Sequence, residues 1–210
     1  MEINKYVNCE EDCDKKKLAL IADLYSNPKS KEEVDKIIEP NTLDSGFFYR
    51  VAIVHEYSFA LPCLEVLNKM KEIGNILEIG AGTGAWTRLL KGMGVDIIAT
   101  DKRDIAYNGY FKKARDNKDV IVMDGLEAIK TYSDRNLFMC WPDYDQSWAF
   151  AVLERFRSGN YFFYIGEDYG GCTGNDDFHK YISSNFEKIE MLAIPQWYGM
   201  HDYFWVYKKK

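Results

Sequence analysis

Apolar residues follow two different periods along this chain, and their alternation predicts a layered α/β fold. Short, uninterrupted apolar runs recur from residue 76 onward, and segments with apolar residues at helical spacing lie between them. The runs predicted to be strands are 76–79, 96–100, 120–123, 137–140 and 161–165. Strands that are apolar on both sides and alternate with amphipathic helices form a parallel sheet with helices on both faces.

The last part of the chain predicts a different strand connection. Two aromatic-rich strands, 189–194 and 203–207, follow one another with only a short loop between them, so we expect an antiparallel hairpin at the end of the sheet. Thr173 and Asp176 predict the cap of the helix that precedes this hairpin. A further helix over residues 61–73 precedes the first strand and ends at Gly74.

The first forty residues predict two helices. An apolar stripe at helical spacing is formed by Leu18, Ile21, Ala22 and Tyr25. Ser30 and Glu33 have the spacing of a capping box, and Pro40 ends the second helix. We expect residues 1–45 to be a helical extension, either a packing element or a lid, on a main domain of residues 46–210.

Composition and charge narrow the function classes. The chain has 210 residues, of which 47% are hydrophobic and 15% aromatic, which excludes a disordered or fibrous protein. Its net charge of −6 disfavours broad binding to nucleic acid or to an anionic membrane. No apolar run approaches a membrane span or a signal-peptide core, and the five cysteines include no Cys-x-x-Cys pair. We therefore predict a soluble cytoplasmic protein with reduced thiols and no metal site.

A glycine-rich loop follows the first predicted strand and begins a helix. It reads Glu-Ile-Gly-Ala-Gly-Thr-Gly over residues 78–84. Glycines at such a turn let the backbone approach a ligand, and the helix start offers free N–H groups. The spacing is one residue shorter than the dinucleotide pattern Gly-x-Gly-x-x-Gly. Glu78 would also crowd a pyrophosphate, whereas a carboxylate suits a sulfonium-bearing amino acid, so a nicotinamide-dependent reductase is disfavoured.

Two more acids follow the next two predicted strands. Asp101 comes directly after the second strand and Asp124 after the third. The carboxyl ends of parallel strands meet at one edge of the sheet, where Asp101 could accept bonds from ribose hydroxyls and Asp124 from an adenine amino group. Taken alone, each aspartate could equally be a helix N-cap.

These motifs resemble those of class I S-adenosylmethionine-dependent methyltransferases over roughly residues 58–208. The resemblance implies a Rossmann-like, seven-stranded sheet, mostly parallel with the last strand antiparallel, and S-adenosylmethionine as cofactor. The cofactor residues that it implies are Glu78, Gly80, Ala81, Gly82, Thr83, Gly84, Asp101, Asp124 and Cys140. The run over residues 57–62 and the later Trp-Pro and Gly-Glu segments also resemble methyltransferase-like proteins of undetermined substrate.

The segment Trp141-Pro142-Asp143-Tyr144 follows the fourth predicted strand. It is similar in Pro142 and Tyr144 to the Asp/Asn-Pro-Pro-Tyr/Phe motif of amino-group methyltransferases. It departs at Trp141 and Asp143, and an indole cannot accept a hydrogen bond, so methylation of a nucleobase amine is in doubt. The predicted substrate-binding residues are Trp141, Pro142, Tyr144, Trp197 and Asp202. The alternative is that the aromatic residues are pocket walls or core.

Candidate proton acceptors lie at the ends of the fifth and last strands. Glu167 follows the fifth strand, and His201 and Asp202 precede the last one. If these strands are neighbours, about 4.8 Å apart, the side chains come within hydrogen-bonding or water-bridged reach. A carboxylate–imidazole pair could take a proton near neutral pH, so Glu167 and His201 are predicted to be catalytic. Tyr144, which would shape the acceptor pocket, completes the predicted catalytic set. Alternatively, His201 only stabilises the hairpin turn.

Together these features favour a methyltransferase that uses S-adenosylmethionine and acts on the N, O or S atom of a small or planar acceptor. The alternative is a non-catalytic module that binds the cofactor or its demethylated product. The residues leave the acceptor and the oligomeric state open.

Overall fold

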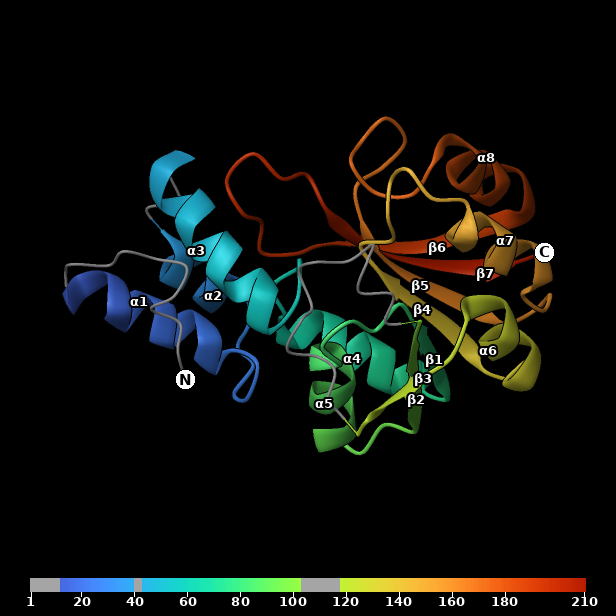
Figure 1. Cartoon of the computed structure of the whole chain (residues 1–210), viewed down its shortest axis with the longest axis horizontal. Coiled ribbons are helices and arrows are strands. Elements are labelled where there is room, and N and C mark those ends of the chain that lie inside the picture. The colour runs from blue at the N-terminus through green and yellow to red at the C-terminus, as the bar shows by residue number, and fades with distance from the viewer. Residues whose placement is uncertain (1–11, 40–42, 103–117) are drawn as a thin grey trace.

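Seven strands form one sheet in the computed structural model, which describes residues 12–39, 43–102 and 118–210. The strands are β1 (Ile76–Ile79), β2 (Ile97–Asp101), β3 (Val120–Val122), β4 (Asn136–Cys140), β5 (Tyr161–Gly166), β6 (Phe186–Ala193) and β7 (Tyr203–Lys209). Their order across the sheet is β3-β2-β1-β4-β5-β7-β6 (Figure 1). The first five are parallel, and β7 runs antiparallel to both of its neighbours. This is the Rossmann-like fold that the resemblance to class I methyltransferases implies, and the predicted terminal hairpin is confirmed.

Strand register brings the predicted site residues to one edge. Glu78 lies beside Ala99 of β2 and Phe138 of β4, so the ends of these three strands reach the same side of the sheet. Gly166 at the end of β5 pairs with Tyr203 at the start of β7. The segment after β5 therefore meets the segment before β7, as the sequence predicts.

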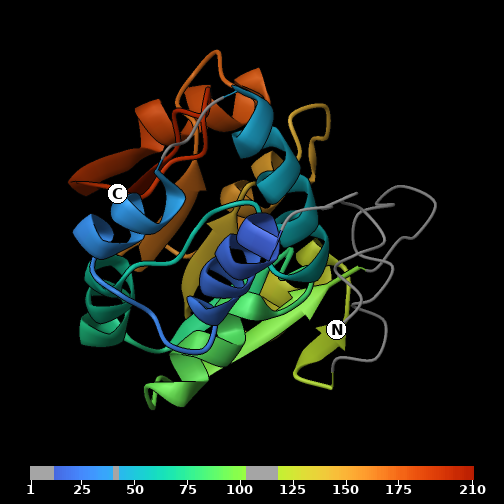
Figure 2. The ribbon, with the colours of Figure 1, turned by 90° about the vertical axis from the view of Figure 1, so that its left-hand side faces the viewer.

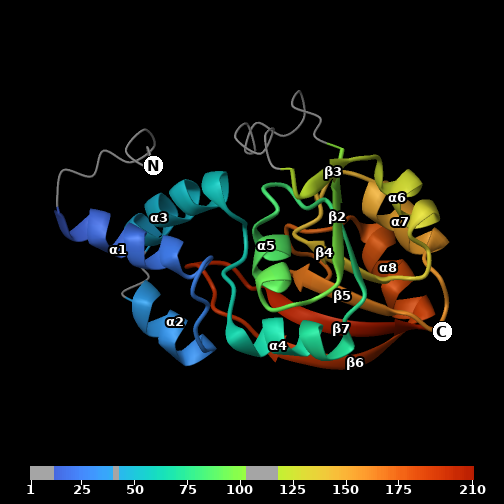
Figure 3. The ribbon, with the colours of Figure 1, turned by 90° about the horizontal axis from the view of Figure 1, so that it is seen from below.

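Helices cover both faces of the sheet (Figures 1 and 3). One face packs against α4 (Leu64–Ile73) and α5 (Ala85–Gly92), and the other against α6 (Gly125–Thr131), α7 (Trp148–Arg155) and α8 (Asp176–Asn185). Alternation along β1 divides the core accordingly, because Ile76 joins the first apolar cluster and Leu77 and Ile79 join the second.

The N-terminal helices lie at one end of the molecule, in front of the sheet in Figure 2. They are α1 (Asp12–Asp23), α2 (Lys31–Ile38) and α3 (Leu43–Glu56). The predicted capping box is confirmed, since Ser30 and Glu33 exchange side-chain and backbone hydrogen bonds. The sequence did not predict α3, because its apolar residues run almost continuously and lack a helical period. The division into residues 1–45 and 46–210 falls inside α3 and stays a prediction.

Three predicted boundaries are wrong for local reasons. The helix expected over residues 61–73 begins only at Leu64, because Pro62 disfavours the helical conformation of the residue before it. The N-cap of α8 is Asn175, whose side chain accepts from the Phe178 N–H, and not Thr173, whose buried hydroxyl accepts from the Glu167 N–H. The strand expected from residue 189 starts at Phe186, directly at the end of α8.

Within the ranges that the structure describes, every helix is too short or too polar to cross a membrane.

Candidate active site

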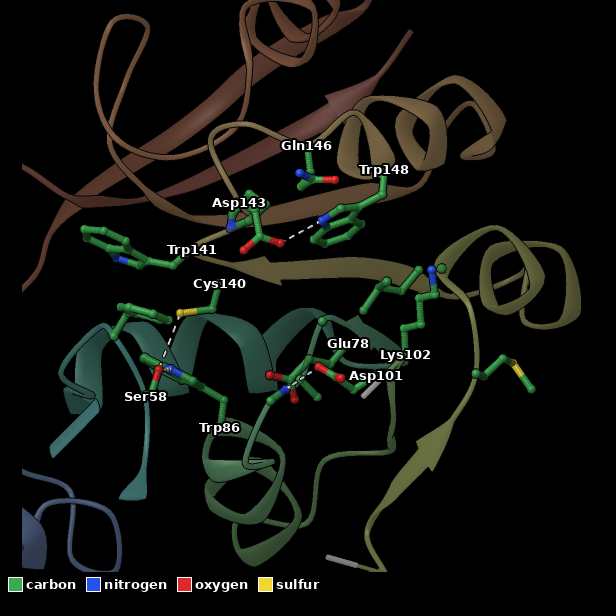
Figure 4. Close-up of a pocket in the computed structure, with 18 of the residues that line it drawn as sticks. Ser58, Glu78, Trp86, Asp101, Lys102, Cys140, Trp141, Asp143, Gln146 and Trp148 are labelled. Carbon is green, nitrogen blue, oxygen red and sulfur yellow. Dashed lines mark hydrogen bonds between the residues drawn. The ribbon is translucent and has the colours of Figure 1, made fainter. Parts of the chain in front are cut away.

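A cavity of about 270 Å³ opens at the carboxyl ends of the parallel strands (Figure 4). It is lined by the loops that follow β1, β2, β3 and β4 and by the residues just after α3. All of the predicted cofactor residues except Thr83 and Gly84 line it, as do Trp141 and Pro142 of the predicted acceptor set. Residues that the sequence places far apart therefore share one pocket.

The glycine loop forms the floor of this cavity. Gly80 has φ +77°, and a Cβ on it would lie 3.1 Å from Cη2 of Trp148, so any side chain there would strain the backbone and meet the indole. The N–H of Gly82 donates to the Asp101 carboxylate at 2.8 Å, which ties the loop to β2. Thr83 and Gly84 brace the loop from outside: the Thr83 hydroxyl donates to the Tyr57 carbonyl, and Gly84 is the N-cap of α5.

Glu78 presents a buried carboxyl group to the cavity. Its side chain is 2% exposed, and Oε2 accepts a hydrogen bond from the Thr87 hydroxyl. Burial raises the pKa of Glu78 to about 8, an effect that the Thr87 hydrogen bond opposes and the nearby Asp101 charge reinforces. The carboxyl is therefore mostly protonated at neutral pH when the cavity holds no cation.

The other two acids of the predicted cofactor set lie across the cavity mouth. Asp101, at the end of β2, faces the glycine loop through its bond to Gly82. Asp124 is the N-cap of α6, with Oδ1 accepting from the Leu126 N–H at 2.9 Å, and it also lines the cavity. The capping role considered for Asp124 is therefore observed together with its place at the site.

Cys140 lies beside Ser58 and Trp86 in the middle of the cavity wall. The Cys140 Sγ is 3.6 Å from the Ser58 Oγ, which accepts from the Trp86 indole N–H at 3.0 Å. Burial raises the pKa of the Cys140 thiol far above its ordinary value. A neutral thiol is a poor nucleophile, so Cys140 belongs to the wall and not to a covalent mechanism.

Two tryptophans from the segment after β4 border the cavity. Trp148 donates its indole N–H to the Asp143 carboxylate at 3.0 Å (Figure 4). Trp141 donates its indole N–H to Oδ2 of Asp202 at 2.9 Å, and its ring stacks on Phe59 with centroids 5.5 Å apart. Asp202 itself is 1% exposed and lies outside the cavity lining, behind Trp141.

The residues predicted to be catalytic take other places. Glu167 is 6% exposed, and its two carboxylate oxygens accept the backbone N–H groups of Cys172 at 2.7 Å and His201 at 2.9 Å. The structure thus brings Glu167 to the His201 backbone, while the His201 side chain is exposed. Tyr144 is 58% exposed. None of these three is among the cavity-lining residues of the described chain, and neither is the buried Trp197.

Several lining residues were not among the predicted site residues. They include Tyr57, Ser58, Phe59, Trp86, Lys102, Asp143, Gln146 and Trp148. The sequence analysis noted the run over residues 57–62 but assigned it no function, because no sequence pattern shows that the end of α3 contacts β4. Lys102 directly follows Asp101, so its place at the cavity could have been predicted from that adjacency.

No family model matches the chain, and no curated protein matches it either. Several solved structures, however, are similar to the chain in fold. A S-adenosylmethionine-dependent methyltransferase from Anabaena variabilis is 13% identical, with a TM-score of 0.48, over 77% of this chain and 87% of that one. TehB from Haemophilus influenzae is 13% identical, with a TM-score of 0.45, over 77% and 67%. The glycopeptide N-methyltransferase MtfA is 12% identical, with a TM-score of 0.45, over 70% and 95%. At such identities and scores, function has to be argued from this chain's own residues.

Proposed function

We propose that the cavity binds S-adenosylmethionine and that the chain transfers its methyl group to the N, O or S atom of a small or planar acceptor. One observation carries the proposal: Glu78, Asp101 and Asp124, at the ends of three consecutive strands, line a single cavity together with the glycine loop. Adenosyl ligands bind at this edge of an open parallel sheet.

The residues present fit such a ligand part by part. The glycine loop is open to close approach at Gly80, and the buried Glu78 carboxyl suits the cationic methionine end. Asp101 suits the ribose hydroxyls and Asp124 the adenine amino group, because a carboxylate only accepts hydrogen bonds and these groups donate them.

Charge supports this ligand over a dinucleotide. Four acidic side chains line the cavity, those of Glu78, Asp101, Asp124 and Asp143, and Lys102 is the single lysine or arginine among the described lining residues. A cation beside Glu78 favours its ionised form. A pyrophosphate would meet repulsion there, whereas a sulfonium would be attracted. The same balance favours a neutral or cationic acceptor over an anionic one.

The sulfonium supplies an activated methyl group, so the protein needs neither a covalent nucleophile nor a metal. The work of the chain is to hold the acceptor in line and to exclude water. The stacked rings of Phe59 and Trp141 provide an aromatic wall for the acceptor. Where the acceptor must lose a proton, His201 remains our proposed group, and Tyr144 remains a proposed catalytic residue that shapes the acceptor pocket. The engaged oxygens of Glu167 give that residue a bracing role instead.

Calorimetry with S-adenosylhomocysteine and, separately, NADH tests the donor. We expect binding of the first only, and at least about tenfold weaker binding in Asp101→Ala, the loss expected for a hydrogen bond to a charged group. No heat with S-adenosylhomocysteine at millimolar concentration would overturn the proposal.

Transfer itself is tested with methyl-labelled S-adenosylmethionine and a small-molecule extract. Labelled product that is reduced in His201→Ala or Tyr144→Phe supports catalysis. Tight binding without any product would favour the alternative, a non-catalytic binding module.

A further inference from the structure

Trp141 has an unusual backbone conformation. Its φ is +53°, in the left-handed region that bulky residues rarely adopt. Such a conformation persists only where the surroundings hold it, and it tends to occur at functional positions. Trp141 directly follows β4 and lines the cavity, so its strain lies at the proposed active site.

Three side chains from other parts of the chain hold the indole. Asp202, just before β7, accepts its N–H at 2.9 Å. Phe59 stacks on the ring at an interplanar angle of 13°, and the guanidinium of Arg50 in α3 lies 5.2 Å from the ring centroid. The ring is therefore fixed by a hydrogen bond in addition to packing.

The Asp202 carboxylate is not needed to close its own loop. The loop between β6 and β7 is tied at this point by Gln196, which donates to the Asp202 backbone carbonyl at 2.7 Å. In the part of the chain that the structure describes, the Trp141 indole is the side chain that donates to Oδ2 of Asp202, and Oδ1 is buried without a partner. A carboxylate that is 1% exposed is costly to bury, which calls for a role beyond the turn.

We propose that Asp202 is a positioning residue, which holds the Trp141 indole as the wall against which a planar methyl acceptor lies. The inference depends on the proposed function, because the wall faces an acceptor only if the donor occupies the end near Glu78 and Asp101. Trp141 lies on the opposite side of the cavity from Asp101 and Lys102 (Figure 4). The Phe59–Trp141 wall consists of two stacked aromatic rings with the Arg50 guanidinium beside both, and aromatic rings of this kind favour an aromatic or heteroaromatic acceptor.

Indole N–H resonances of the ¹⁵N-labelled protein test this without a known acceptor. The chain has five tryptophans, so five signals are expected, and Trp141→Phe assigns the one that matters. We expect Asp202→Leu to shift the Trp141 signal and Asp202→Asn to restore most of it, because the asparagine carbonyl still accepts the N–H. Asp143→Leu is the matched control, since it removes the acceptor of the other carboxylate–indole bond and should move only the Trp148 signal.

Binding and kinetics separate positioning from other roles. All Asp202 variants should bind S-adenosylhomocysteine within about twofold of the unmodified chain, because Asp202 lies outside the donor end. Once a methyl acceptor is identified, Asp202→Leu should raise the KM for that acceptor about tenfold with little change in kcat. In a Trp141→Phe background the same substitution should then have no further effect.

Three results decide the inference. An unmoved Trp141 signal in Asp202→Leu, with S-adenosylhomocysteine binding intact, overturns it. A full Asp202 effect on KM in the Trp141→Phe background also overturns it, in favour of direct contact with the acceptor. Burial raises the pKa of the Asp202 carboxyl to about 6, and the charges of Glu167 and Arg50 lie nearby. If Asp202→Leu does not fold, Asp202→Asn decides: the Trp141 signal must shift with pH near 6 in the unmodified chain and stay unchanged in this variant. Absent S-adenosylhomocysteine binding, in contrast, refutes the proposed function.

Discussion

Glu78 should make donor binding depend on pH. The carboxyl lies buried at the cavity, and burial raises its pKa to about 8 from a usual 4.5. A cationic ligand beside it favours the ionised form, so binding must release the proton that the ligand-free protein holds. Affinity should therefore rise as the pH rises toward the pKa of Glu78 and level off above it.

The size of the effect follows from that pKa. At pH 7 only about one tenth of the ligand-free molecules have an ionised Glu78, and above pH 9 about nine tenths do. If the ligand binds only the ionised form, its affinity at pH 7 is reduced about tenfold, which is about 1.4 kcal/mol. Each further unit below pH 7 should reduce it another tenfold.

Titration calorimetry from pH 6 to pH 9 with S-adenosylmethionine, which carries the sulfonium that S-adenosylhomocysteine lacks, measures this dependence, and Glu78→Gln is the control. Glutamine has no proton to lose, so the difference in pH dependence between the two proteins isolates Glu78 from the titration of the ligand. Buffers with different ionisation enthalpies should show nearly one proton released at pH 7. Equal pH profiles for the two proteins would refute the reasoning.

The raised pKa of Glu78 should also make the folded protein less stable as the pH rises. The folded pKa lies above the unfolded one, so between pH 4.5 and about 8 the folded chain holds a proton that the unfolded chain has lost. The free energy of unfolding of the ligand-free protein should therefore fall across this window, by a few kcal/mol in total. Urea unfolding at pH 5 and pH 8 should show the fall, and Glu78→Gln should reduce it.

Other substitutions test separate parts of the site. Gly80→Ala should lose about 1–2 kcal/mol of stability and also S-adenosylhomocysteine affinity, because it adds backbone strain and a contact with Trp148. Gly94 has φ +81°, and a Cβ on it would meet nothing within 4 Å. Gly94→Ala should therefore lose stability in urea unfolding but keep its affinity for S-adenosylhomocysteine in calorimetry, and equal affinity losses in the Gly80 and Gly94 variants would contradict this. Glu167→Leu should destabilise the chain by several kcal/mol, because it leaves the Cys172 and His201 N–H groups without their carboxylate, and a small change in the urea midpoint would argue against the bracing role. Cys140→Ser should keep most of the methyl transfer measured with labelled donor, since a neutral thiol has no chemical role there; loss of all transfer with binding intact would reverse that view.

The sequence predicted those parts of the fold that local patterns encode. Short apolar strands such as 161–165, flanked by amphipathic helices, are typical of a parallel sheet with helices on both faces, and few other folds bury them. The glycine loop, Asp101 and Asp124 were found because each lies at the end of such a strand. Strand ends meet by topology alone, so their convergence needs no knowledge of side-chain packing.

The sequence patterns could not predict contacts between segments that are distant in the chain. Trp148 reaches the glycine loop across 68 positions of the chain, and its packing on Gly80 leaves no periodic signal. Glu167 was predicted to face the crevice as a catalytic acid, because it follows a central strand. Its burial and its hydrogen bonds to two backbone N–H groups depend on the shapes of two loops, which the sequence pattern does not encode. α3 was missed because an almost continuous apolar run fits a strand as well as a buried helix.

The two ends of the cavity are built differently, and this separates donor binding from acceptor choice. The proposed donor residues Glu78, Asp101 and Asp124 come from one continuous part of the sheet, and their positions are set by strand pairing. The proposed acceptor wall combines Arg50 and Phe59 with Trp141 and Asp202, which lie in three separate parts of the sequence. Substitutions in α3 or in the loop before β7 can therefore reshape the wall without disturbing the strand ends. If this division holds, Arg50→Ala and Asp202→Leu should alter which acceptors are used while S-adenosylhomocysteine binds as before.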